Sequence, residues 1–198
     1  METADKDGVP RRPLVAVIGD ASLSPGDPKI TAARELGSLI IGRRWRLLTG
    51  GLGGVMQEAS SGARASPAWQ DGDIIGVIPG SDPAVANPYI DVVISTGMDH
   101  MRNSIVAHSD AIIVVGGGAG TLSEIALAWI YRRLIVSLPH EGWGAKLAGT
   151  RVDGRIRYKD IPDDCVRPAS TPAQAIELVA SFIHFYKRRH NGISKGYG

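Results

Sequence analysis

Short apolar runs alternate with longer amphipathic segments along most of the chain. Six runs of four to six mainly apolar residues predict β-strands, at residues 14–18, 46–49, 74–78, 90–95, 111–115 and 134–138. The segments between them predict helices over residues 28–42, 55–63 and 99–109, from 121 onward and from 172 onward. Parallel strands need crossover connections of about this length. The alternation therefore predicts a three-layer α/β fold with a parallel, doubly wound sheet of about six to seven strands.

Polar residues and prolines mark the predicted helix starts. Asp27 followed by Pro28 has the chemistry of an N-cap and a first helical residue. Asp99 is the predicted N-cap of the helix over 99–109, and Pro172 is predicted to open the last helix. These positions set the expected helix boundaries.

The length of 198 residues favours a single domain, predicted over residues 13–190. Residues 1–12 are polar and interrupted by proline, which predicts a disordered arm, and residues 191–198 are predicted to form a flexible tail. Residues 140–164 are predicted to form a loop with a hairpin turn at Asp153 and Gly154.

Composition excludes several classes of protein. The nearly even balance of 22 basic and 20 acidic residues disfavours nucleic acid as a partner. No segment has the roughly 20 apolar residues that span a bilayer, so we expect a cytoplasmic protein without a membrane partner. The single cysteine, Cys165, excludes an intramolecular disulfide. His100 and His108 lack acidic or cysteine partners at ligand spacing, so no metal site is expected.

Three predicted strands end in turns of small residues. Ligands of open parallel sheets bind at the carboxyl ends of strands, and the N–H groups of a following helix N-terminus attract phosphate. We therefore predict that these turns bind a small anionic ligand. The predicted binding residues are Gly19, Asp20 and Ser22 after the first strand, Gly50, Gly51, Gly53 and Gly54 after the second, and Gly117, Gly118, Gly120 and Thr121 after the fifth.

Two nucleotide-binding motifs are missing from these turns. The first turn lacks the Gly-x-Gly-x-x-Gly pattern of dinucleotide-binding proteins, and no lysine follows the glycines as in a P-loop. The sequence thus disfavours an NAD-dependent oxidoreductase and a P-loop NTPase.

Glu124 and Arg102 each allow two interpretations. Glu124 could lie beside a bound sugar phosphate as a hydroxyl acceptor or catalytic group, or it could complete a capping box with Thr121 as N-cap. With Asp99 as N-cap, Arg102 would lie in the first helical turn, where a cation opposes the helix dipole by about 0.3–1 kcal/mol. An incoming anion would explain that position, and a solvated arginine offset by Asp99 is the alternative.

The helix that begins at Thr121 is apolar on nearly all sides. Its apolar residues are Leu122, Ile125, Leu127, Trp129 and Ile130. Such a helix is either buried centrally or shared with a second subunit. We favour a homo-oligomer, either a dimer or a dimer of dimers.

Three motifs resemble, in order and spacing, those of the Lonely Guy and molybdenum cofactor carrier superfamily. They are GGLGGVM at 50–56, TGM at 96–98 followed by Arg102 and Asn103, and GGGAGTLSE at 116–124. The resemblance spans residues 14–180 and is closest to the molybdenum cofactor carrier branch. It implies a Rossmann-like protein that binds the molybdenum cofactor or related anions as an oligomer.

The same resemblance implies roles for individual residues. In the Lonely Guy enzymes, which are cytokinin riboside monophosphate phosphoribohydrolases, the glycine loop holds the 5′-phosphate. Their catalytic arginine and glutamate fall on Arg102 and Glu124. Two positions depart from the enzymes: Val115 replaces a proline and Asn103 replaces a lysine.

Two functions follow from these observations. In the first, which we favour, the protein binds a phosphate-bearing ligand such as the molybdenum cofactor or a nucleotide, with Arg102 and Asn103 supplying charge and hydrogen bonds. In the second, it is an N-glycosidase that releases base and ribose 5-phosphate from a nucleoside 5′-monophosphate. There Glu124 would stabilise an oxocarbenium-like transition state. Neither function requires a further cofactor.

Overall fold

The computed structural model describes residues 11–187. The predicted tail and most of the predicted arm lie outside the described residues. The last two arm residues, Arg11 and Arg12, form ion pairs with Asp110 and Asp73. No helix in the described range has both the length and the apolarity needed to cross a membrane.

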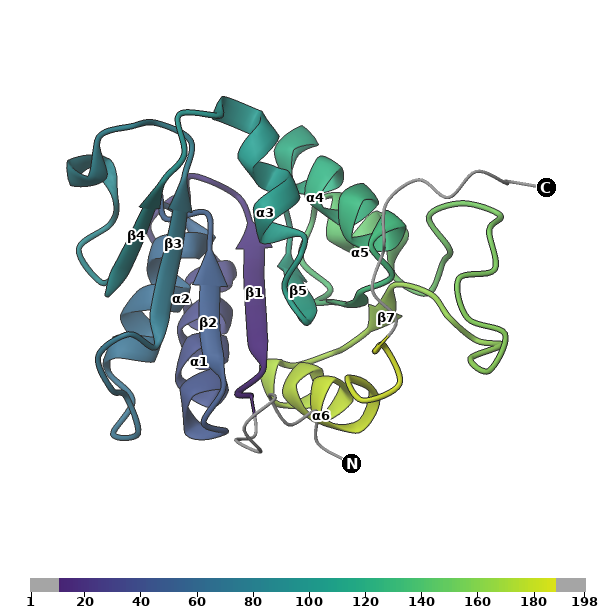
Figure 1. Cartoon of the computed structure of the whole chain (residues 1–198). Helices are drawn as coiled ribbons and strands as arrows, with labels where there is room; N and C mark the ends of the chain where they lie inside the picture. The colour runs from purple at the N-terminus through teal and green to yellow at the C-terminus, as the bar shows by residue number, and fades with distance from the viewer. Residues whose placement is uncertain (1–10, 188–198) are drawn as a thin grey trace.

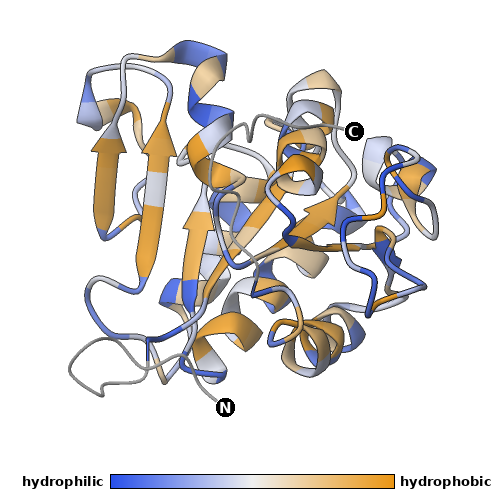
Figure 2. Cartoon of the chain, turned by 45° about the vertical axis from the view of Figure 1, so that its right-hand side comes forward, coloured by the Kyte–Doolittle hydropathy of each residue, from blue (hydrophilic) through white to orange (hydrophobic). Residues whose placement is uncertain are grey.

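Seven parallel strands form one sheet in the order β4-β3-β2-β1-β5-β6-β7. Their bounds are β1 (Leu14–Gly19), β2 (Arg46–Thr49), β3 (Ile74–Ile78), β4 (Val92–Ser95), β5 (Ala111–Val115), β6 (Leu134–Ser137) and β7 (Arg167–Pro168). The predicted parallel, doubly wound sheet is confirmed. Every residue of β5 is buried, because helices cover both faces at the centre of the sheet. Figure 2 shows the strands as mainly apolar ribbons.

Helices cover the two faces of the sheet (Figure 1). Their bounds are α1 (Pro28–Gly42), α2 (Val55–Arg64), α3 (Asn103–Val106), α4 (Ala119–Ile130), α5 (Trp143–Leu147) and α6 (Pro172–Phe182), with 3₁₀ turns η1 (Pro83–Val85) and η2 (Asp99–Arg102). Helices α1, α2 and α6 share one apolar core with alternate strand residues. Helices α3, α4 and α5 pack on the opposite face. The molecule thus has the three predicted layers.

Side-chain caps fix two of the helix starts. Asp27 accepts a hydrogen bond from the N–H of Lys29 at 2.9 Å, and Pro28 follows as the first residue of α1. Thr171 caps α6 by accepting the N–H of Gln174 at 3.1 Å. Both helices begin at the predicted prolines.

The predicted hairpin at Asp153 and Gly154 is wrong, since no strand forms between residues 148 and 166. The Asp153 carboxylate instead accepts the N–H of Arg155 and the indole N–H of Trp129, both at 3.0 Å. These two bonds fold the segment into a local turn and attach it to α4. Helix α5 and strand β7 flank this segment, and neither was predicted from the sequence.

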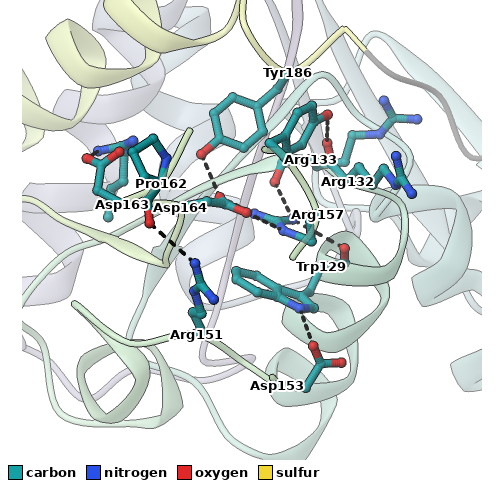
Figure 3. A network of polar contacts seen from close by, with 12 residues as sticks. Trp129, Arg132, Arg133, Arg151, Asp153, Arg157, Pro162, Asp163, Asp164 and Tyr186 are labelled. Atoms are coloured by element: carbon teal, nitrogen blue, oxygen red, sulfur yellow. Dashed lines mark hydrogen bonds and ion pairs between the residues drawn. The ribbon is translucent and has the colours of Figure 1, made fainter. Parts of the chain in front are cut away.

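A buried ion pair holds the same segment against the C-terminal end of α4 (Figure 3). The guanidinium of Arg157 donates two hydrogen bonds to Asp164, at 2.8 and 2.7 Å. It also donates to the carbonyl groups of Trp129 and Arg133. The hydroxyl of Tyr186 donates to Asp164 at 2.7 Å, which brings in the chain that follows α6.

The strand order creates a switch point at the centre of the sheet. From β1 the chain builds outward through β2 and β3 to β4, and then returns to the other side of β1 as β5. The connections that leave β1 and β5 therefore diverge to opposite faces of the sheet. In open parallel sheets this divergence leaves a crevice at the carboxyl ends of the strands.

Candidate functional site

A cleft of about 380 Å³ lies at this switch point. Its volume falls in the range of about 300–1,000 Å³ that is usual for small-molecule sites. It is lined by Ile18, Gly19, Asp20, Ala21, Leu52, Met56, Pro79, Asp99, His100, Arg102, Asn103, Gly118, Gly120, Thr121 and Glu124. The cleft thus draws on the ends of β1, β2, β3 and β5 together with η2.

The N-terminus of α4 opens into the cleft. Gly118 is the N-cap, and the first hydrogen bond of the helix runs from the N–H of Leu122 to the carbonyl of Gly118 at 3.0 Å. The N–H groups of Ala119, Gly120 and Thr121 therefore have no partner inside the helix. Together with the positive end of the helix dipole, they can bind an anion.

Two side chains join this helix start to the end of β1. The hydroxyl of Thr121 donates to the carbonyl of Gly19 at 3.2 Å. The N–H of Gly117 donates to the carboxylate of Asp20, also at 3.2 Å, so this predicted donor already has a partner. Gly117 has φ +98°, a value that favours glycine, and it does not line the cleft.

Arg102 and Glu124, both lining residues, form a buried ion pair. The Nη1 atom of Arg102 lies 3.2 Å from Oε1 of Glu124, and both residues are less than 9% exposed. Burial raises the pKa of Glu124 to about 7, and the charge of Arg102 opposes this only in part. Burial likewise lowers the pKa of Arg102. A carboxyl group with a pKa near neutrality can carry a proton in acid–base chemistry.

The expected N-cap at Asp99 is wrong. Asp99 has φ +49°, and the N-cap of η2 is Met98, whose own N–H donates to the hydroxyl of Thr96 at 3.2 Å. Arg102 therefore ends a 3₁₀ turn and is the N-cap of α3. Arg102 is therefore not in the first turn of a helix over 99–109. Its side chain is buried and pairs with Glu124, so it is not a solvated arginine.

The capping-box interpretation of Glu124 is also wrong. Helix α4 begins at Ala119, two residues before the predicted start, so Thr121 is its third residue and not its N-cap. The hydroxyl of Thr121 binds Gly19 in place of a helix N–H group. Glu124 lies in the second turn, with its carboxylate toward Arg102.

Asn103 lines the cleft and is bonded to α4. Its amide donates to the hydroxyl of Ser123 at 2.7 Å and more weakly to the carbonyl of Gly120 at 3.4 Å. This side chain therefore helps to fix the first turn of α4.

The glycines after β2 are not among the residues that line the cleft. A Cβ atom on Gly50 would lie 2.5 Å from the guanidinium nitrogens of Arg102, so this glycine leaves room for the arginine. A Cβ on Gly54 would lie 2.2 Å from the carbonyl of Asp20, where the loops after β1 and β2 meet. The predicted site residues outside the lining are Ser22, Gly50, Gly51, Gly53, Gly54 and Gly117.

Several lining residues were missed by the sequence analysis. They are Ile18, Ala21, Leu52, Met56, Pro79, Asp99 and His100. Leu52 and Met56 belong to the glycine motif after β2, but only glycines were selected there. Among residues 11–187 no group of three or more His, Cys, Asp or Glu side chains could hold a metal ion.

Comparisons with known proteins agree with this fold. A family model described as the SLOG cluster4 family matches residues 12–166. The molybdenum cofactor binding protein from Rippkaea orientalis is 32% identical, with a TM-score of 0.70 over 87% of this chain and 98% of that one. The molybdenum cofactor carrier protein from Chlamydomonas reinhardtii is 30% identical, with a TM-score of 0.69 over 87% of this chain and 99% of that one.

One similar enzyme matches over a shorter region. It is a cytokinin riboside 5′-monophosphate phosphoribohydrolase from Mycobacterium tuberculosis, 40% identical over 102 residues. The match covers 49% of this chain and 52% of the enzyme, so the chain spans about half of that relative's length.

Proposed function

The chain belongs to the SLOG cluster4 family, and from this premise we propose that it binds a small, phosphate-bearing anion without breaking a bond in it. The observation that carries the proposal is the convergence of two features on one cleft. Gly118, Gly120 and Thr121 at the start of α4 line it, and so does Arg102. The helix start supplies fixed dipoles, and Arg102 supplies a charge that its contact with Glu124 holds in place.

The ligand classes are those that the similar proteins suggest. Two similar structures of nearly full coverage are a molybdenum cofactor binding protein and a molybdenum cofactor carrier protein. A pterin phosphate of this kind would be cargo of the protein, and a nucleoside 5′-monophosphate is the other candidate. In either case the phosphate binds at Gly118, Gly120 and Thr121, near Arg102 and Asn103.

Equilibrium binding tests this proposal. The protein as purified is examined by native mass spectrometry for a retained ligand, and AMP is titrated into it by calorimetry. We expect Arg102→Ala to weaken AMP binding by about 10- to 100-fold, the loss typical of a charged hydrogen-bond donor. Arg43→Ala is the matched control, since it removes an exposed guanidinium that pairs with Glu177. Absence of any ligand and of any AMP binding would refute the proposal.

A second candidate function is phosphoribohydrolase activity. The observation that favours it is Glu124, a buried carboxyl group with its pKa near 7, beside Arg102. Val115 and Asn103, which differ from the enzymes' pattern, favour binding without hydrolysis. The test is to incubate the protein with AMP and measure free adenine. Adenine released by the wild-type protein, but not by Glu124→Gln, would establish hydrolysis in place of simple binding.

We also propose that the protein acts as a homo-oligomer. Five exposed apolar side chains fall within residues 92–105, and we call them the β4–α3 surface: Val92, Ile94, Met98, Met101 and Ile105. Val92 and Ile94 pair in register with Ile75 and Val77, whose side chains pack with the α3–α5 layer. They therefore face the side of the sheet that this layer leaves open at β4 (Figure 1). A second copy of the chain would cover it.

A further inference from the structure

The acidic residues of the cleft pose a problem for an anion site. Three carboxylates line it, those of Asp20, Asp99 and Glu124. Asp99 is 87% exposed at its side chain, so water screens its charge. Glu124 pairs with Arg102, and with its pKa raised to about 7 it is partly protonated near neutral pH, so the pair retains positive charge. Asp20 lies next to the start of α4 and needs a partner of its own if a phosphate is to bind there.

Lys29 is that partner. Its Nζ atom lies 2.8 Å from Oδ2 of Asp20, and the two side chains are 17% and 29% exposed. The hydrogen bond and charge of Asp20 raise the pKa of Lys29, so the lysine stays charged. Asp20 lines the cleft, whereas Lys29 is not among the lining residues.

The two oxygens of Asp20 have different surroundings. Oδ2 accepts hydrogen bonds from Lys29 and from the N–H of Gly117. Within residues 11–187, Oδ1 accepts none. An ionised carboxylate can accept about four hydrogen bonds, so Oδ1 retains its full capacity on a residue that lines the cleft.

We propose that Asp20 and Lys29 determine ligand specificity. The Oδ1 atom of Asp20 accepts a hydrogen bond from a hydroxyl or N–H group that the ligand carries beside its phosphate. Lys29 cancels the charge of the carboxylate so that the phosphate can bind near it. This inference rests on the proposed anion site and narrows the ligand to phosphate esters of a polyol, sugar or other donor-bearing group.

Two probes separate recognition of the phosphate from recognition of its neighbour. Inorganic phosphate carries no neighbouring donor group, whereas ribose 5-phosphate carries several hydroxyl groups. Wild-type protein should bind ribose 5-phosphate more tightly than inorganic phosphate. Asp20→Asn should weaken ribose 5-phosphate binding by about 10- to 100-fold, since a charged acceptor is lost. Inorganic phosphate should bind that variant equally well or more tightly, because a nearby negative charge has been removed.

Two further variants test the role of the lysine. Lys29→Met leaves the carboxylate uncompensated and should weaken both probes by about 3- to 10-fold. Asp27→Asn is the matched control. The Oδ2 atom of Asp27 lies 3.7 Å from Nζ of Lys29, but Asp27 does not line the cleft, and asparagine retains the N-cap. This variant should bind both probes within about twofold of wild type. Thermal unfolding of each variant verifies that it is folded.

The outcomes separate a failure of the specificity role from a failure of the proposed anion site. If wild type binds both probes and Asp20→Asn weakens them equally, Asp20 only holds the glycine turn, and the specificity role is overturned while the anion site stands. The specificity role is likewise overturned if Asp20→Asn weakens neither probe. If wild type binds neither probe, the specificity role is overturned, and the anion site fails with it if the protein also retains no ligand and does not bind AMP.

Discussion

Gly117 and Gly118 are neighbours, but the structure predicts different consequences for a side chain at each. Gly117 has φ +98°, and its Cβ would lie 2.5 Å from the side chain of Thr121. Gly118 has φ −94°, and its Cβ would meet no atom within 4 Å. We expect Gly117→Val to lower the free energy of unfolding by at least about 2 kcal/mol, through backbone strain and steric overlap.

Gly118→Val should change stability by less than about 1 kcal/mol and weaken phosphate binding by at least about tenfold. Its side chain would enter the cleft in front of the α4 amides. Urea unfolding and phosphate titration of both variants measure the two effects. Normal phosphate affinity in a folded Gly118→Val protein would mean that the anion binds elsewhere.

The pKa of Glu124 predicts a pH-dependent stability. Burial raises this pKa from 4.5 to about 7 in the folded protein. A carboxyl group with a raised pKa favours folding in its protonated form. That contribution is complete below pH 4.5 and is lost as the pH rises through 7. Each pKa unit corresponds to about 1.4 kcal/mol, so the loss is on the order of 3 kcal/mol.

Glu124→Gln removes this titration. Relative to Glu124→Gln, the wild-type protein should therefore lose unfolding free energy as the pH rises from 4 to 8. Urea unfolding at four pH values measures it. Parallel pH profiles for the two proteins would show that the pKa of Glu124 is the same in the folded and the unfolded protein, which contradicts the prediction.

At the residue scale, the sequence predicted much of the site's composition but not its geometry. From local pattern, Arg102 was selected because its charge would oppose a helix dipole, and Glu124 as a carboxylate beside a bound sugar phosphate, with a capping box as the alternative. The dipole position and the capping box are both wrong, because the two side chains bind each other. They are 22 positions apart, and no local pattern encodes a contact between segments that meet only after the sheet has formed.

Helix α4 is fixed at both ends by residues from distant segments. Its start bonds to Gly19 and Asn103, and its end is held by the buried pair of Arg157 and Asp164. Asp164→Asn leaves Arg157 as a buried, unpaired charge. We expect it to cost about 3–5 kcal/mol of unfolding free energy, as broken buried ion pairs do.

Asp163→Asn is a matched control one residue away. Asp163 is 69% exposed at its side chain, so water screens its charge, and Arg167, which is 9% exposed, keeps its contact with the ring of Phe182 in the variant. This control should lose less than about 1 kcal/mol. Chemical denaturation of both variants tests the contrast. Equal losses of unfolding free energy would mean that the buried pair of Arg157 and Asp164 stabilises the protein no more than the exposed Asp163 does.

At the element scale, the regular part of the fold was predictable and the irregular part was not. The strands of the sheet centre are apolar runs bounded by glycine or polar residues, and these were found with at most small shifts in their ends. The predicted helix over 99–109 is instead a 3₁₀ turn followed by the short helix α3. Gly97 and Asp99 have positive φ values, and the sequence pattern did not indicate the second of these.

At the scale of the whole molecule, the strand order determines where the site lies. Because β5 returns beside β1, the turns after these strands become neighbours although about 100 residues separate them. The hydrogen bond between Thr121 and Gly19 crosses this junction. Prediction of a parallel sheet was sufficient to place all glycine turns at one edge. It did not specify which turns line the cleft, and among the glycines after β2 it is Gly50 that leaves room for the guanidinium of Arg102.

The β4–α3 surface yields the last prediction. Ile94 is 41% exposed on the edge strand, although its partner in register, Val77, is fully buried. If a second copy of the chain covers Ile94, a charged side chain at this position would be buried in the contact without a partner, which disfavours association. We expect wild type to sediment as a dimer or larger oligomer, and Ile94→Asp to shift it toward monomer with little loss of secondary structure.

Ile156→Asp is the matched control for this prediction, because Ile156 is 66% exposed in the segment over 148–166, away from the β4–α3 surface. It should leave the oligomeric state unchanged, since an aspartate at that position disturbs only local contacts. Sedimentation velocity at several protein concentrations distinguishes the cases. A wild-type protein that stays monomeric at high concentration contradicts the homo-oligomer. A dimer that survives Ile94→Asp but dissociates in Ile156→Asp would instead place the subunit contact on the opposite edge, beside β7, where the buried pair of Arg157 and Asp164 lies.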